Sequence, residues 1–356
     1  MADMTDPSSI RDCEITLHGN VVAYRHGGRS EGGAPTMVLL HGIASNAQTW
    51  DPVIEEFART HEVIAPDLIG HGRSAKPMGD YSIGGYATVV RDLLLALETE
   101  RVTLVGHSLG GGIALQLVHM SPDLIGRLIL VDSGGLGPDL GVPLRAASLP
   151  GAPIFIRAAT SLPAQAAGRA VHRMLDAAHI QLPTDVEEGL EGFASLHDPD
   201  ARKAFLNTVR ASTDLGGQRV SAIDKLYLMD DCPALTIWGE DDSIIPVSHA
   251  FEAQALVPHM EVAVIQRAGH FPHVDDPDRF VALVREFEEA TEPSELTTES
   301  IGAMLRDEMV SDPRLEVVEP GSSVERGDED PTSSGAGGDD ELLAPGAGED
   351  DELLVG

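Results

Sequence analysis

The chain has 356 residues, of which 42% are hydrophobic, and its formal net charge at pH 7 is −34. That charge argues against nucleic-acid binding, because a phosphate backbone would be repelled. No apolar run approaches the roughly 20 residues of a membrane span, the first residues lack the order of a secretory signal, and Cys13 and Cys232 have no metal-binding or redox spacing. We therefore expect a cytoplasmic protein without metal or cofactor.

The first 135 residues alternate between strand and helix patterns. A hairpin is predicted for EITLHG and VVAYRHGG, and a continuous apolar run at residues 36–40 is typical of a strand buried on both faces. Strands and helices then follow in turn: a helix at 46–59, a strand at EVIAPD, a helix at 83–97, a strand at VTLVG, a helix at about 109–120 and a strand at LILVD. This alternation predicts βαβ units and a mostly parallel sheet.

The pattern changes at about residue 134. Apolar residues fall at helical spacings up to about residue 228, with several prolines and no clear strand, which predicts a helical insertion. Alternation then resumes with a strand at PALTIWG, a helix at 247–256, a strand at MEVAVI and a helix at 278–290.

Beyond residue 290 the chain becomes acidic. Residues 291–356 hold 19 acidic and 3 basic residues, and one short amphipathic helix is expected at 295–310. Residues 321–356 are rich in glycine, serine, proline and acids, with DDELL occurring twice, and are predicted to be disordered. We therefore expect a core domain of residues 1–133 and 229–290, a helical cap at 134–228, an extension at 291–320 and an acidic tail at 321–356.

The motif with the clearest chemistry is GHSLG at residues 106–110, which fits G-x-S-x-G between an apolar strand and a helix. A sharp strand-to-helix turn would strain Ser108 and expose its hydroxyl, and glycines two positions away leave room for that turn. The neighbouring N–H of Leu109 would point to the same space from a helix N-terminus. The alternative is an ordinary glycine turn with a solvated serine.

A serine nucleophile needs a base, and the base needs an acid. His270 follows the strand MEVAVIQ beside a glycine, with His273 as its nearest rival. The acid is expected in GEDD at residues 239–242, after the preceding strand. The order is serine, acid and then histidine, each at the carboxyl end of a strand, which is a workable triad order. A second oxyanion amide is expected from Ile43, in the loop after the strand at 36–40, and His41 is expected to hold that loop by hydrogen bonding.

Taken together, these pieces resemble the α/β-hydrolase superfamily. The resemblance covers about residues 15–290 through HGIASNAQTW, APDLIGHGRS, VGHSLGG, WGEDDSIIP and AGHFPHVDDP. It implies an α/β-hydrolase fold with a mostly parallel central sheet, flanking helices and a helical cap over the active site. The W-G-x-x-D pattern of relatives selects Asp242 as the acid, whereas relatives that place it after the earlier strand would use Asp132. Relatives with an aspartate nucleophile are disfavoured by Ser108.

The resemblance implies a serine hydrolase that forms an acyl-enzyme on a small-molecule substrate. The apolar residues of the cap suggest a small, largely apolar ester or lactone. The same triad would also support C–C bond hydrolysis of ring-cleavage products, acyl transfer or perhydrolysis, and the fold also serves as a small-molecule receptor or scaffold. Nothing in the sequence indicates the oligomeric state.

Overall fold

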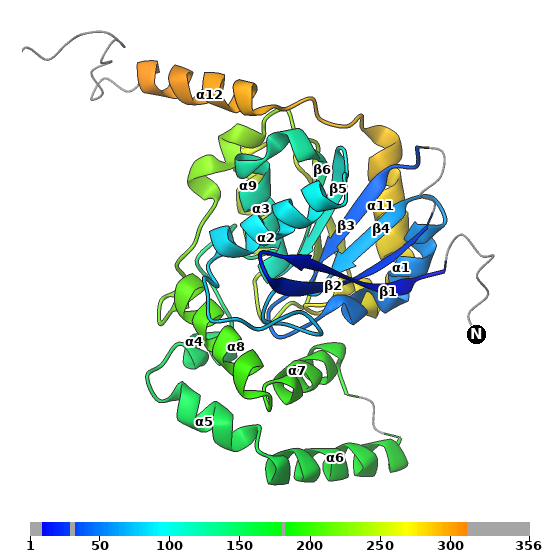
Figure 1. Cartoon of the computed structure of the whole chain (residues 1–356), viewed down its shortest axis with the longest axis vertical. Coiled ribbons are helices and arrows are strands. Elements are labelled where there is room, and N and C mark those ends of the chain that lie inside the picture. Colours follow the sequence, from blue (N-terminus) through cyan, green and yellow to red (C-terminus); the bar gives the residue numbers. More distant parts are fainter. Residues whose placement is uncertain (1–8, 29–32, 180–181, 312–356) are drawn as a thin grey trace, which may run out of the picture. The chain divides into compact units, whose positions relative to one another are not determined.

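The computed structural model describes residues 9–28, 33–179 and 182–311. The segment 321–356, predicted to be disordered, lies outside the described residues. The described residues up to 308 form one compact unit. Its centre is an eight-stranded sheet with the order β1-β2-β4-β3-β5-β6-β9-β10 (Figure 1). The strands are β1 Arg11–Leu17, β2 Asn20–Gly28, β3 Thr36–Leu40, β4 Glu62–Pro66, β5 Val102–His107, β6 Ile125–Val131, β9 Ala234–Gly239 and β10 Glu261–Ile265.

The sheet is mostly parallel, as predicted. Within it, β2 pairs in antiparallel fashion with β1 on one side and β4 on the other, whereas β4, β3, β5, β6, β9 and β10 run parallel to one another. Every residue of β5 and β9 is buried, because helices cover both faces of the sheet. The burial of these central strands therefore agrees with the continuous apolar runs from which they were predicted.

Helices form a layer on each side of the sheet (Figure 1). One hydrophobic cluster joins the sheet to α1 (Asp51–Ala58) and α11 (Pro277–Ala290). The other joins it to α2 (Ile83–Ala96), α3 (Leu109–Met120) and α9 (Ser248–Leu256). The Ser82 side chain caps α2 by accepting a hydrogen bond from the Gly85 N–H, and the Asp276 side chain caps α11 in the same way through Arg279.

Between β6 and β9 lie five helices, which we call the cap helices. They are α4 Val142–Ala147, α5 Ala152–Ala159, α6 Leu162–Ala177, α7 Thr184–Ser195 and α8 Pro199–Ser212. Side chains from α4, α5 and α8, together with Leu196, form a small hydrophobic cluster, and in Figure 1 the cap helices lie below the carboxyl ends of the strands. The predicted cap limits, 134–228, stay a prediction, as do the limits of the other domains.

Two details differ from the predicted elements. The helix expected at 46–59 begins as a 3₁₀ turn, Ala47–Trp50, before α1. The insertion holds a short antiparallel hairpin, β7 (Thr213–Asp214) with β8 (Gly217–Gln218), so the expectation of no strand there was wrong. Two residues per strand are too few to show an apolar alternation. The remaining elements are the 3₁₀ segments Pro122–Leu124 and Ile223–Met229, with α10 Pro272–Asp275 and α12 Thr298–Ser311.

The register of the sheet brings the predicted site loops together. The carboxyl ends of parallel strands meet at one edge, where ligands bind in open α/β sheets. The strands that carry the site end near the same level, as the paired residues Leu40 and Gly106, His107 and Val131, Val131 and Ile237, and Gly239 and Ile265 show.

Candidate active site

Ser108 occupies a strained turn between β5 and α3. Its backbone has φ 53° and ψ −113°, outside the regions that a non-glycine residue normally adopts. A Cβ at Gly106 would overlap the Gly110 carbonyl, and one at Gly110 would overlap the Leu40 carbonyl at the end of β3. Both glycines are therefore required for the turn, which holds Ser108 at the edge of the sheet with 5% of its surface exposed.

His270 lies in the loop between β10 and α10 and is hydrogen bonded to Asp242. Its Nδ1 is 2.8 Å from Asp242 Oδ2, and the other oxygen of Asp242 accepts from the N–H groups of Ile244, at 2.7 Å, and Ile245, at 3.0 Å. A carboxylate bonded to Nδ1 keeps the hydrogen there and leaves Nε2 able to accept a proton. Burial by itself would raise the pKa of Asp242, but the charge of His270 and these hydrogen bonds hold it below its ordinary value.

Asp132, the alternative acid, lies behind this pair in a different role. Its Oδ1 accepts from the Gly239 N–H at 3.0 Å, and its side chain is fully buried. Burial, followed by the charge of Asp242, raises the pKa of Asp132 well above its ordinary value. The structure therefore pairs His270 with Asp242 and leaves Asp132 as a buried neighbour that holds its proton more tightly than an ordinary aspartate.

The two expected oxyanion amides belong to Leu109, which directly follows Ser108, and to Ile43. Leu109 is the first residue of α3, so its N–H has no acceptor within the helix. Ile43 lies in the loop after β3, which His41 holds as expected: its Nδ1 donates to the Gly42 carbonyl at 2.7 Å, and its Nε2 accepts from the Leu68 N–H at 2.9 Å. Burial lowers the pKa of His41 to about 4, so its ring is neutral at pH 7.

The rival base His273 points elsewhere. It is fully buried, its Nε2 is 3.1 Å from Thr49 Oγ1, and its ring lies 4.4 Å from that of Trp50. Burial lowers its pKa to about 3. His273 is thus a core residue, whereas His270 lines the same cavity as Ser108.

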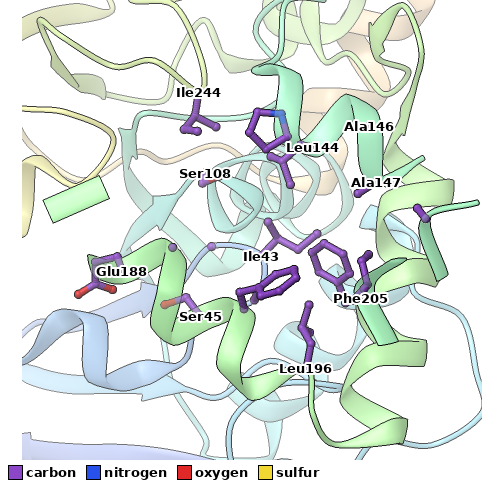
Figure 2. Close-up of a pocket in the computed structure, with 18 of the residues that line it drawn as sticks. Ile43, Ser45, Ser108, Leu144, Ala146, Ala147, Glu188, Leu196, Phe205 and Ile244 are labelled. Carbon is purple, nitrogen blue, oxygen red and sulfur yellow. The ribbon is translucent and has the colours of Figure 1, made fainter. Parts of the chain in front are cut away.

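That cavity has a volume of about 790 Å³ and lies between the edge of the sheet and the cap helices. Figure 2 shows Ser108 within it, apolar side chains such as Ile43 to one side, and Glu188 to the other. Among the described residues that line it, the only acids are Asp185 and Glu188, both from α7, and there is no lysine or arginine. Most of its cap-side walls are apolar, with Leu144, Leu149, Phe155, Phe193, Leu196 and Phe205 among them.

Ser108 also lines a second, smaller cavity, which has a volume of about 90 Å³. Ile43 lines both cavities, whereas Leu109 lines only the smaller one among the described residues.

Comparison with known proteins places the chain in a family. Residues 35–277 match the model of the α/β hydrolase fold family. The chain belongs to this family. An uncharacterized protein of Mycobacterium tuberculosis is 43% identical to this α/β hydrolase over 295 residues, covering 82% of this chain and 85% of the relative.

Two further matches come from more distant members. A 2-hydroxy-6-oxo-2,4-heptadienoate hydrolase of Pseudomonas putida is 27% identical over 266 residues, covering 72% of this α/β hydrolase and 90% of the relative. Among solved structures, a bacterial membrane phospholipase A superimposes with a TM-score of 0.63 at 23% identity, covering 80% and 87% of the two chains. At that identity the likeness shows the fold alone.

One group of side chains in this α/β hydrolase has the make-up of a metal site. Asp132, Asp242 and His270 offer ligand atoms within 4.8 Å of one another, the one such group among the residues that the structure describes. Within it, His270 Nδ1 is already bonded to Asp242. A metal ion bound to His270 Nδ1 would have to break that bond, so the two aspartates are better suited to orienting His270 than to binding a metal. No helix in the described part of the chain is long and apolar enough to cross a membrane.

Three residues near the site could not be recognised from the sequence. Asp185 and Glu188 reach the cavity from α7, and His107 donates from Nε2 to the His270 carbonyl at 2.8 Å. Asp185 and Glu188 belong to a helix with four acidic residues, so charge alone could not single them out. His107 occupies a variable position of its motif.

Proposed function

We propose that this chain is a serine hydrolase that cleaves uncharged, largely apolar carboxylic esters or lactones through Ser108, His270 and Asp242. The observation that carries the proposal is the cavity above Ser108, which is large and mostly apolar and has no lysine or arginine among its described lining residues. An apolar acyl or alcohol group gains free energy by leaving water for such a space, at roughly 25 cal/mol per Å² of buried apolar surface.

In the proposed reaction, His270 Nε2 removes the proton of Ser108 as its oxygen attacks the acyl carbon. The N–H groups of Ile43 and Leu109 stabilise the oxyanion, and His270 then protonates the leaving alcohol. Water, deprotonated by His270, releases the acid from the acyl-enzyme and restores the serine. Asp242 stays ionised throughout and stabilises the protonated imidazole.

A second candidate is C–C bond hydrolysis, which is favoured by the 27% identity to a heptadienoate hydrolase. A dienoate carries a carboxylate. In this cavity it would meet Asp185 and Glu188 and no lysine or arginine among the described lining residues. Like charges at short distance in an apolar space repel strongly, so the charge of the cavity favours the neutral ester.

A matched pair of substrates separates the two candidates. The p-nitrophenyl esters of pentanoic acid and of glutaric acid present acyl chains of equal length, and only the second carries a free carboxylate. We expect kcat/KM to be at least about 10-fold higher for the neutral ester. The Glu188→Lys variant should narrow the difference, because it replaces a carboxylate of the cavity with a cation.

The nucleophile is tested with Ser108→Ala. We expect the variant to lose about 10³-fold or more of kcat, together with covalent labelling by a fluorophosphonate. Full ester turnover by Ser108→Ala, or a preference of the native chain for the anionic ester or a dienoate, would overturn the proposed function.

A further inference from the structure

The backbone of His270 is held on both sides by side chains from other parts of the fold. Its N–H donates to Asp185 Oδ1 at 2.7 Å, and its carbonyl accepts from His107 Nε2 at 2.8 Å. With the bond from its ring to Asp242, His270 therefore has one contact each to α7, to the end of β5 and to the loop after β9. Of these three, only Asp185 comes from the cap helices.

The loop around His270 is shaped to admit the Asp185 carboxylate. A Cβ at Gly269 would lie 2.5 Å from Asp185 Oδ1, closer than real Cβ atoms approach their neighbours. The Gly269 N–H donates to Asp275 Oδ2 at 2.8 Å. Two consecutive N–H groups therefore each bind a carboxylate, Asp275 from α10 of the core and Asp185 from the cap.

Asp185 is half-buried, lines the cavity, and lies among other titratable groups. His270, Asp242 and Asp275 all act on it electrostatically. Burial raises the pKa of Asp185, and the hydrogen bond and charge of His270 act in the opposite direction. The carboxylate and a protonated imidazole therefore stabilise each other, in addition to the stabilisation that Asp242 provides.

We propose that Asp185 is a positioning residue through which the cap helix α7 fixes the backbone of His270 and stabilises its protonated ring. This inference rests on the proposed function. It makes the alignment of the base depend on the cap: when α7 lies against the core the His270 N–H has its acceptor, and when α7 moves away that acceptor is lost. A substrate that packs under α7 would then help to assemble the site that cleaves it.

Two variants separate the hydrogen bond from the charge. Asp185→Ala removes both, whereas Asp185→Asn keeps an oxygen that can accept from the His270 N–H and removes only the charge. Glu187→Gln is the matched control, because Glu187 is an exposed acid on the same helix. Activities are measured on the neutral p-nitrophenyl ester and normalised to active sites titrated with a fluorophosphonate.

We expect Asp185→Ala to lower kcat by about 10-fold or more with KM changed by less than about threefold. Asp185→Asn should keep kcat within about threefold of the native value. Its acidic limb of kcat/KM should move to lower pH, because a protonated imidazole that has lost a nearby negative charge gives up its proton more readily. Glu187→Gln should change neither kcat nor the acidic limb of kcat/KM.

A second readout does not depend on turnover. Hydrogen exchange of the peptide 268–273 should be at least about 10-fold faster in Asp185→Ala than in the native chain and unchanged in Asp185→Asn, because only the alanine lacks the acceptor. Unchanged kcat, pH profile and exchange in Asp185→Ala would overturn the positioning role. So would equal losses of kcat in both variants with an unmoved pH profile, which is the pattern of a merely structural residue. A native chain that is unlabelled and hydrolyses no ester would instead refute the proposed function, and the exchange experiment would still test the contact.

Discussion

Asp132 and Asp242 are adjacent buried aspartates, and replacing each with asparagine should affect activity very differently. Asp242 is the charged partner of His270, at 2.8 Å, and its side chain has no exposed surface. An asparagine there removes the charge and can present an N–H to His270 Nδ1, which favours the wrong tautomer. We expect kcat to fall by about 10³- to 10⁴-fold, or about 4 to 5.5 kcal/mol of transition-state stabilisation.

Asp132→Asn is the matched control, because it makes the same chemical change a few ångströms away. Burial and the charge of Asp242 raise the pKa of Asp132 well above its ordinary value, so the neutral asparagine side chain imitates the protonated acid, and its amide oxygen can still accept from the Gly239 N–H. We expect its kcat to stay within about threefold of the native value, which corresponds to a loss of under about 1 kcal/mol of transition-state stabilisation.

The same control should also change stability. Unfolded Asp132 ionises near pH 3.8, whereas the folded residue stays protonated well above that value. Its contribution to the free energy of unfolding is therefore complete below pH 3.8 and is lost as the pH rises towards its folded pKa. Asparagine removes that loss, so the Tm of Asp132→Asn at pH 7 should exceed the native Tm by a few degrees.

Both variants are assayed at pH 7 with the neutral p-nitrophenyl ester, after active-site titration, and their Tm values are measured by calorimetry. The reasoning is refuted if Asp132→Asn loses as much activity as Asp242→Asn, since Asp132 would then be the acid that matters. It is refuted equally if Asp242→Asn keeps more than a tenth of the native kcat.

Two further predictions concern stability. Gly110→Ala should lower the free energy of unfolding by about 1–3 kcal/mol or more, because its Cβ would meet the backbone carbonyls of Leu40 and His41. By contrast Gly168→Ala, in α6 with open space around it, should raise it by about 0.5–1 kcal/mol; equal effects in denaturant titrations would contradict the elbow geometry. Burial lowers the pKa of His41 to about 4 and those of His71 and His273 to about 3. The contribution of these neutral rings to the free energy of unfolding is therefore complete above pH 6.5 and is lost as the pH falls towards those values. Stability should decline by up to about 4 kcal/mol per pH unit in that window, and a Tm that stays flat between pH 7 and pH 5 would rule this out.

Local sequence was enough to predict most of the fold. The strand at 36–40 was predicted with its observed limits, because a strand buried on both faces is a continuous apolar run. The helix at about 109–120 was also predicted with its observed limits. The turn at Ser108 was also readable, since its strain is relieved by glycines two positions away. These features depend on residues within a few positions of one another. The hairpin of β7 and β8 was missed because its strands have only two residues each.

The choice between Asp132 and Asp242 needed the tertiary structure, because both follow strands that end at the same edge of the sheet. Side-chain direction separates them: Asp132 Oδ1 faces the Gly239 N–H, and Asp242 Oδ2 faces His270. The contact of Asp185 with His270 joins residues 85 positions apart and leaves no local pattern. Sequence alone thus determined the order of the elements and the candidates for nucleophile, acid and base. Only the packing of the cap helices against the sheet decided which carboxylate binds the backbone N–H of His270 and what charge a substrate would encounter in the cavity. Those contacts join segments that lie far apart in the chain, so no local residue pattern records them.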